Sequence, residues 1–136
     1  MKIALTGAAT GIGAATAKAL QLQGARITGF DIVEADAVSD FIRVDLGDLA
    51  QIENSVRKAS KEGPYDALIN CAGLPPRDGL AARILAVNFF GLRAFTEAML
   101  PANGRMRHYR ECGIPRRVRV AQEYQPGQGA DGLGWP

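Results

Sequence analysis

A glycine-rich segment near the start of the chain has the composition of a loop that could hold a phosphate group. Glycines stand at both ends of the segment Gly7–Gly13, and between them lie Ala8, Ala9, Thr10, Gly11 and Ile12. A tight turn between a strand and a helix exposes backbone N–H groups at the helix N-terminus, where the helix dipole favours a pyrophosphate. The G-x3-G-x-G spacing differs from the G-x-G-x-x-G of most dinucleotide folds, and a purely structural turn is the alternative.

An acidic residue, Asp31, lies 18 residues after Gly13, at the end of the second predicted strand. Its carboxylate could accept hydrogen bonds from both hydroxyls of an adenosine ribose and would repel a 2′-phosphate. The residue therefore favours NAD over NADP as the cofactor. The alternative is an ordinary loop carboxylate, which is our interpretation of Asp36 and Asp40.

Two short motifs follow the next two predicted strands. The pair Asp45-Leu46 could touch an adenine edge, although an acid at a helix N-terminus is the alternative and suits Asp48 better. In the run Asn70–Gly73, small residues would let the backbone approach a ligand, and the amide of the asparagine could link neighbouring strands. Cys71 within this run has no candidate base, so we predict that it packs rather than acts as a nucleophile.

A fifth motif, the run Val87–Gly91, lies inside a helical stretch. Asparagine is unfavourable in the middle of a helix, so Asn88 needs a hydrogen-bond partner or a functional role. We predict that the aromatic pair Phe89 and Phe90 packs in the core or at an interface rather than against a cofactor.

The elements that must hold these motifs alternate between strand and helix. The predicted strands are Lys2–Thr6, Arg26–Phe30, Phe41–Val44 and Ala67–Ile69, and the predicted helices are Gly11–Gln23, Leu49–Lys61 and Gly79–Leu100. Short links between alternating elements predict an α/β fold, a Rossmann-type doubly wound parallel sheet in the strand order 3-2-1-4. No strand is predicted after Pro101, so the sheet is expected to be incomplete, with its fourth strand at an edge.

In their order and spacing, these motifs resemble the short-chain dehydrogenase/reductase family over about residues 1–101, most of all its bacterial 3α-hydroxysteroid dehydrogenase/carbonyl reductase branch. The resemblance implies NAD-dependent oxidoreduction of a secondary alcohol or ketone, such as a 3-hydroxysteroid. It implies that Gly7–Gly13 hold the pyrophosphate and Asp31 the ribose, and that the other cofactor-binding residues are Asp45, Leu46, Asn70, Ala72 and Gly73. It also implies that Asn88 is the asparagine of the family's catalytic helix.

The resemblance also implies a serine, a tyrosine and a lysine four residues after the tyrosine, which lowers the tyrosine pKa for proton transfer. This sequence lacks that pair, because the residues four places after its three tyrosines are Ile69, Gly113 and Gln128. No serine follows a predicted fifth strand. We therefore expect the chain to be inactive by itself.

Residues 102–136 differ in composition from the preceding residues. They hold six Arg, six Gly and three Pro and carry a net charge of +3, against −1 for residues 1–101. No strand or helix period runs through them, so we predict a disordered or frameshifted tail outside the family domain. Codons for this tail can be chosen that, after one base is dropped, encode ITVNVAS, which is similar to the family's fifth strand and catalytic-serine region.

The composition of the whole chain excludes several classes of function. A net charge of +2 is too small to indicate a nucleic-acid or anionic-membrane partner, and one His and two Cys cannot build a multi-histidine metal site or a disulfide framework. We expect a cytoplasmic, metal-free protein that forms homo-oligomers or aggregates through its exposed edge strand and apolar helix. The main hypothesis is the NAD-binding part of a dehydrogenase, and the alternative is a nonenzymatic nucleotide-binding or sensing module with a basic partner-binding tail.

Overall fold

A parallel sheet forms the centre of the computed structural model, which describes residues 1–102 and 108–111. The strand order is β3-β2-β1-β4-β5, so the predicted order 3-2-1-4 is confirmed and extended by one strand. The strands are β1 (Lys2–Thr6), β2 (Arg26–Asp31), β3 (Asp40–Arg43), β4 (Ala67–Asn70) and β5 (His108–Glu111). This order matches the first five strands of the doubly wound order 3-2-1-4-5-6, and it reverses between β1 and β4.

The presence of β5 corrects two sequence predictions. β4, predicted to be an edge strand, lies between β1 and β5, with Ala67 paired to His108 and Asn70 to Glu111. Residues 108–111, predicted to be irregular, form that outer strand, whereas the rest of the predicted tail lies outside the described residues. The physical reason is that β4 has backbone groups that need partners, and a right-handed crossover returns the chain to this side of the sheet.

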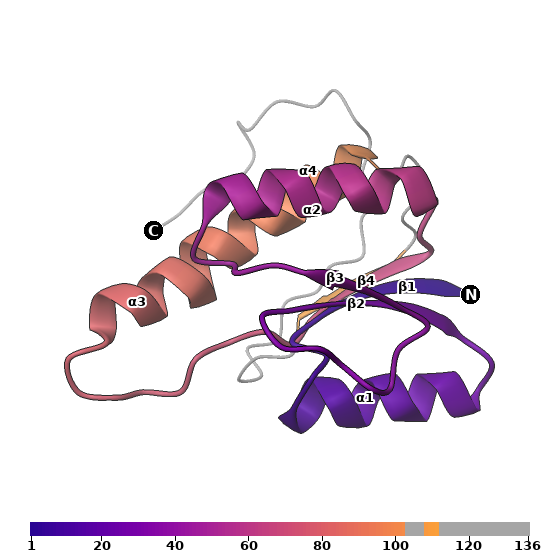
Figure 1. The fold of residues 1–136 in the computed structure, drawn as a ribbon, viewed down its shortest axis with the longest axis horizontal. Helices are drawn as coiled ribbons and strands as arrows, with labels where there is room; N and C mark the ends of the chain where they lie inside the picture. The colour runs from indigo at the N-terminus through magenta and orange to yellow at the C-terminus, as the bar shows by residue number, and fades with distance from the viewer. Residues whose placement is uncertain (103–107, 112–136) are drawn as a thin grey trace, which may run out of the picture.

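Helices cover both faces of the sheet, as Figure 1 shows. α1 (Gly11–Leu22) lies on one face, and α2 (Leu49–Glu62) lies on the other together with α4 (Leu92–Ala102). α3 (Ala81–Leu85) and η1 (Ala86–Gly91), a π-helical segment, continue directly into α4. The predicted helix 79–100 is therefore one continuous helix that begins and ends two residues later than expected. Its last turn includes Pro101, which lacks the N–H that would donate to the carbonyl four residues earlier, and the helix ends one residue later.

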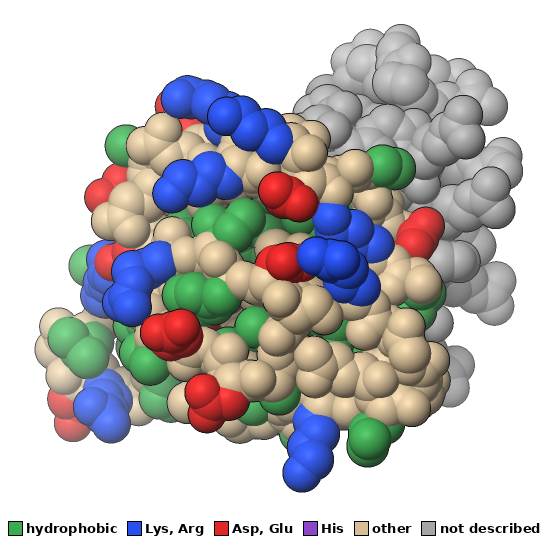
Figure 2. Space-filling view, turned by 45° about the vertical axis from the view of Figure 1, so that its right-hand side comes forward, with side chains coloured by type: hydrophobic (Ala, Val, Ile, Leu, Met, Phe, Trp, Pro, Cys, Tyr) green, Lys and Arg blue, Asp and Glu red, His purple; other side chains and the backbone are tan. Residues whose placement is uncertain are grey.

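The outer surface carries charges of both signs. On the face shown in Figure 2, Lys and Arg side chains are interspersed with Asp and Glu side chains rather than gathered into a field of one sign. Among residues 1–102 and 108–111, no helix has the length and apolar character needed to cross a membrane. The same residues contain no group of three His, Cys, Asp or Glu side chains that could hold a metal ion.

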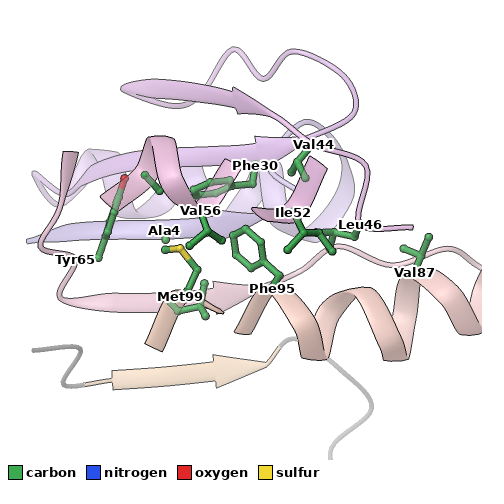
Figure 3. Packing of buried hydrophobic residues seen from close by; sticks show 12 residues of the cluster. Ala4, Phe30, Val44, Leu46, Ile52, Val56, Tyr65, Val87, Phe95 and Met99 are labelled. Carbon is green, nitrogen blue, oxygen red and sulfur yellow. The ribbon is translucent and has the colours of Figure 1, made fainter. Parts of the chain in front are cut away.

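Two hydrophobic clusters hold the helices on the sheet. The larger one packs β2 against α4 through Phe30 and Phe95, whose rings meet edge to face with centroids 4.9 Å apart (Figure 3). The smaller one packs α1 against the opposite face, with Ile3, Leu5, Ala17 and Ile27 buried. α2 begins after Asp48, whose carboxylate caps it by accepting hydrogen bonds from Ala50 N at 2.9 Å and Gln51 N at 3.1 Å. The predicted role of Asp48 as a helix N-terminal acid is thus confirmed.

Candidate nucleotide-binding site

The glycine-rich segment joins β1 to α1 at the carboxyl edge of the sheet. Gly7 has a φ of 70° and Gly11 a φ of 56°, a left-handed conformation that favours glycine. A Cβ at Gly7 would lie 2.6 Å from the backbone nitrogen of Ala72, and one at Gly13 would overlap the Gly7 carbonyl. The loop is therefore wound so tightly against the end of β4 and its own helix that only glycines fit there.

The first turn of α1 presents backbone amides to this loop. The side chain of the N-cap residue, Thr10, makes no hydrogen bond to the first turn of α1. The backbone amides of that turn are therefore not used by a side-chain cap. The partial positive charge of the helix N-terminus lies at the same end. A loop with exposed amides, close backbone packing and a helix dipole is the arrangement predicted for a pyrophosphate site.

Asp31, the last residue of β2, is tied to this loop by its carboxylate. Oδ2 accepts a hydrogen bond from Ala9 N at 3.0 Å, and Oδ1 accepts from Ile32 N at 2.7 Å and Val33 N at 3.3 Å. The side chain is only partly buried, and a carboxylate can accept about four hydrogen bonds, so it keeps acceptor capacity beyond these three. The structure thus brings the predicted ribose-binding acid into direct contact with the predicted phosphate loop.

Asp45 is held by a residue that the sequence analysis missed. Its Oδ2 pairs with Arg83 Nη2 at 2.5 Å, and its Oδ1 accepts from Gly47 N at 2.8 Å. A Cβ at Gly47 would collide with the Arg83 guanidinium, so the absence of a side chain there gives the arginine its path. Leu46 is buried beside this corner. The predicted adenine-flanking pair therefore sits in a corner fixed from α3.

Asn70 links three elements through a buried hydrogen-bond network. Its Oδ1 accepts from Thr6 Oγ1 of β1 at 3.2 Å, and its Nδ2 donates to Thr96 Oγ1 of α4 at 3.0 Å. Thr6 Oγ1 accepts in turn from Ala72 N at 3.2 Å, which fixes the start of the loop after β4. The prediction that Asn70 ties neighbouring strands together is confirmed.

Asn88 has a structural partner in the same loop. Its Oδ1 accepts from Leu74 N at 2.7 Å, and its Nδ2 donates to Leu74 O at 2.9 Å. This reciprocal pair explains how η1 tolerates an asparagine, because both polar ends of the amide are satisfied. Gly73 lies beneath the amide, where a Cβ would be 3.6 Å from Asn88 Oδ1. The predicted cofactor-lining loop is thus clamped from the long helix.

Of three other residues singled out in the sequence, one packs as predicted and two do not. Cys71 is partly buried and packs against the smaller core cluster, as predicted. Phe89 and Phe90 are 49% and 55% exposed, so the predicted possibility that they pack in the core is wrong. The reason is geometric: η1 turns Val87 and Gly91 toward the sheet, and the two phenyl rings point away from it.

Tyr65 does not have the surroundings of a proton-transfer residue. It is buried two residues before β4, and its hydroxyl donates to Thr28 Oγ1 at 3.1 Å. Burial raises the pKa of its phenol above the ordinary value, the opposite of what a family tyrosine needs. Tyr109 and Tyr124 are the other tyrosines, and the structure describes only the backbone of the first and nothing of the second.

The contacts that the sequence analysis did not predict come from Thr6, Leu74, Arg83 and Thr96. Each touches a predicted site residue from 14 to 66 positions away in the chain. Only Thr6 carried a local signal, because it directly precedes the glycine-rich segment at the end of a strand. The other three gain their contacts from the way the long helix packs over the sheet edge.

Comparison with known proteins places this geometry in a family. The sequence is 39% identical over 100 residues to the 3-alpha-hydroxysteroid dehydrogenase/carbonyl reductase of Comamonas testosteroni, an alignment that covers 74% of this chain and 38% of the relative. The chain thus spans about two fifths of the length of that protein.

Solved structures agree. The 3-alpha-hydroxysteroid dehydrogenase of Pseudomonas sp. B-0831 complexed with NADH superposes with a TM-score of 0.66 at 32% identity, covering 78% of this chain and 43% of that one. The F189W actinorhodin polyketide ketoreductase with NADPH superposes with a TM-score of 0.67 at 27% identity, covering 76% of this chain and 47% of that one. The sequence model described as short chain dehydrogenase matches residues 2–108, and the chain therefore belongs to the short-chain dehydrogenase family.

Proposed function

We propose that this chain is the NAD-binding portion of a dehydrogenase that oxidises or reduces a secondary alcohol or ketone, such as a 3-hydroxysteroid. The observation that carries the proposal is the hydrogen bond from Ala9 N to Asp31, which sets a carboxylate against the glycine-rich loop. An anionic group at this place favours two ribose hydroxyls and opposes a 2′-phosphate. Of the two similar solved structures, one holds NADH and the other NADPH. The proposed preference of this chain for NAD therefore rests on the Asp31 carboxylate.

Each part of the site would have a separate task. The loop 7–13 would bind the pyrophosphate through the N-terminus of α1 and through amides other than those of Gly7 and Ala9, which donate to Phe30 O and to Asp31. Asp31 would bind the adenosine ribose. The corner at Asp45 and Leu46 would flank the adenine. Asn70, Ala72 and Gly73, held by Thr6 and Asn88, would form the floor toward the nicotinamide. When bound, NAD supplies the hydride chemistry, while these residues bind and orient it.

We further propose that the chain does not catalyse this reaction alone. The sequence has no Tyr-x3-Lys pair, and Tyr65, the one tyrosine whose side chain the structure describes, donates its hydroxyl hydrogen bond to Thr28. General acid–base catalysis typically contributes about 10²–10⁴-fold, and without it the hydride transfer has no proton partner. Turnover of NADH with a ketosteroid by a sequence-verified sample would contradict this part of the proposal.

The proposed partners are NAD and, in the whole enzyme, a small alcohol or ketone. We propose no nucleic-acid or membrane partner, since the net charge of the chain is only +2 and charges of both signs are mixed on the face shown in Figure 2. A cytoplasmic location accords with the composition of the chain. Membership of an oxidoreductase family favours this function over a nonenzymatic sensing module.

Isothermal calorimetry with the 136-residue chain tests cofactor choice. We expect NAD and ADP-ribose to bind weakly and NADP to bind less tightly still. Asp31→Ala should narrow the difference between NAD and NADP, because it removes the repulsion of the 2′-phosphate. Asp36→Ala, an exposed carboxylate in the following loop, is the matched control and should leave the difference unchanged. A wild-type preference for NADP would overturn the assignment.

A further inference from the structure

A positive charge stands beside the carboxylate that would bind the ribose. Asp31 and Arg43 are paired positions of the parallel strands β2 and β3, so their side chains leave the same face of the sheet. From this juxtaposition we infer that Arg43 is a second specificity-determining residue, which attracts the 2′-phosphate that Asp31 repels. The inference rests on the proposed function, because it concerns the ribose end of the same nucleotide site.

The two side chains both hydrogen-bond to the backbone of Ile32. Asp31 Oδ1 accepts from Ile32 N at 2.7 Å, and Arg43 Nη1 donates to Ile32 O, also at 2.7 Å. Both charged groups are thereby held at the carboxyl edge of the sheet, one bonded to the N–H and the other to the C=O of the same residue. None of the ion pairs among the described side chains joins them, so the guanidinium is not neutralised by this carboxylate.

Arg43 has the chemistry to bind a phosphate. The side chain is exposed, and its hydrogen bond to Ile32 O engages one of five N–H donors. A guanidinium matches phosphate oxygens in a two-pronged geometry, and such charge-assisted bonds are stronger than a bond to a neutral carbonyl. A phosphate on the ribose 2′-oxygen next to Asp31 would come within reach of this group.

The two charges therefore act in opposite directions on the same ligand group. In the wild-type chain the carboxylate, which would contact the ribose directly, dominates and NAD is preferred. Once the carboxylate is neutral, the attraction by Arg43 is unopposed and selectivity should reverse. A purely structural Arg43, one that only holds the Ile32 carbonyl, would influence both nucleotides equally.

A double-mutant cycle measured by calorimetry separates these possibilities. The probes are ADP-ribose and 2′-phospho-ADP-ribose, which need no nicotinamide pocket, and the readout is the ratio of their dissociation constants. The variants are Asp31→Asn, Arg43→Gln and the double variant. Asp31→Asn keeps the shape and an acceptor oxygen for Ala9 N, and Asp31→Ser is a second neutral form. Arg57→Gln, an exposed arginine on α2, is the control for loss of one positive charge.

We expect Asp31→Asn to bind 2′-phospho-ADP-ribose more tightly than ADP-ribose, and the added Arg43→Gln to reduce this preference roughly tenfold. The preference should also weaken as salt is raised. If Arg43→Gln leaves the ratio of the two dissociation constants unchanged, in the wild-type chain or in Asp31→Asn, the inference is overturned while the proposed function stays intact. Failure of the wild-type chain to bind ADP-ribose would instead contradict the proposed function, and the inference with it.

Discussion

The backbone of Gly91 in η1 lies directly against the carbonyl oxygen of Leu46. A Cβ built on this glycine would overlap that oxygen, so no side chain can occupy the position without movement of the helix or the loop. Arg83 provides a second link between the same helix and the same corner through Asp45. The long helix therefore fixes the place where the adenine is expected to bind, from two points two turns apart.

Replacement of Gly91 by alanine tests this contact. In an ordinary helix the change would stabilise the protein, since alanine is favoured over glycine by up to about 1 kcal/mol. Here we expect a loss of about 1–3 kcal/mol in the free energy of unfolding, because the new methyl group overpacks the contact with Leu46. Urea denaturation measures the change. Gly73→Ala, whose methyl group would meet nothing closer than 3.6 Å, is the control, and a gain in stability for Gly91→Ala would contradict the packing.

The buried network around Asn70 gives a second prediction. Thr96→Val keeps the shape of the side chain and removes the oxygen that accepts from Asn70 Nδ2. Asn70 is only 2% exposed, so its amide would find no water in exchange. We expect a loss of about 1–3 kcal/mol in the free energy of unfolding. Thr96→Ser, which retains the hydroxyl, should recover most of it, and equal losses in both variants would show that the methyl group matters instead.

Local patterns in the sequence single out most residues of the candidate site, whereas the contacts that hold these residues in place are long-range. Asp31, the glycines and Asn70 are readable because each ends a strand or begins a helix, and parallel strands bring their carboxyl ends together. Arg83 gave no signal, since its partner Asp45 lies 38 residues away and the pairing depends on the path of the long helix. β5 was missed for another reason. Its residues, HYRE, show no apolar run, and it forms a strand because it pairs with the backbone of β4 on the side away from β1.

The N-cap of α2 provides a prediction for pH dependence. Hydrogen bonds from Gln51 and Ala50 hold the pKa of the Asp48 carboxyl below its usual value. A lowered folded-state pKa stabilises the fold above the unfolded value of about 3.9, and this contribution is lost as the pH falls through the folded value.

Asp48→Asn isolates that contribution, because asparagine caps helices as well as aspartate does and does not titrate. We expect the wild-type chain to lose more thermal stability than the variant when the pH is lowered from about 5 to about 3. Thermal unfolding followed by circular dichroism at several pH values measures the difference. Parallel curves for the two chains would contradict a coupling between this carboxyl and folding.

The exposed aromatic pair of η1 leads to a prediction about assembly. Phe89 and Phe90 are 49% and 55% exposed and meet edge to face with centroids 5.2 Å apart, and Leu85 beside them is 52% exposed. Burial of one such side chain is worth roughly 1.5–3 kcal/mol, so a second copy of the chain that covers this face would gain several such contributions. We expect dimers or larger oligomers in sedimentation velocity experiments, with a distribution that depends on concentration.

Phe89→Ser with Phe90→Ser should shift that distribution toward the monomer without lowering the free energy of unfolding of the monomer, because neither ring belongs to the core clusters. Leu22→Ser is the matched control: its side chain is 82% exposed on α1, which covers the opposite face of the sheet (Figure 1). It should leave the distribution unchanged. A wild-type chain that sediments as a monomer at all concentrations, or an equal response to Leu22→Ser, would exclude this surface as the site of self-association.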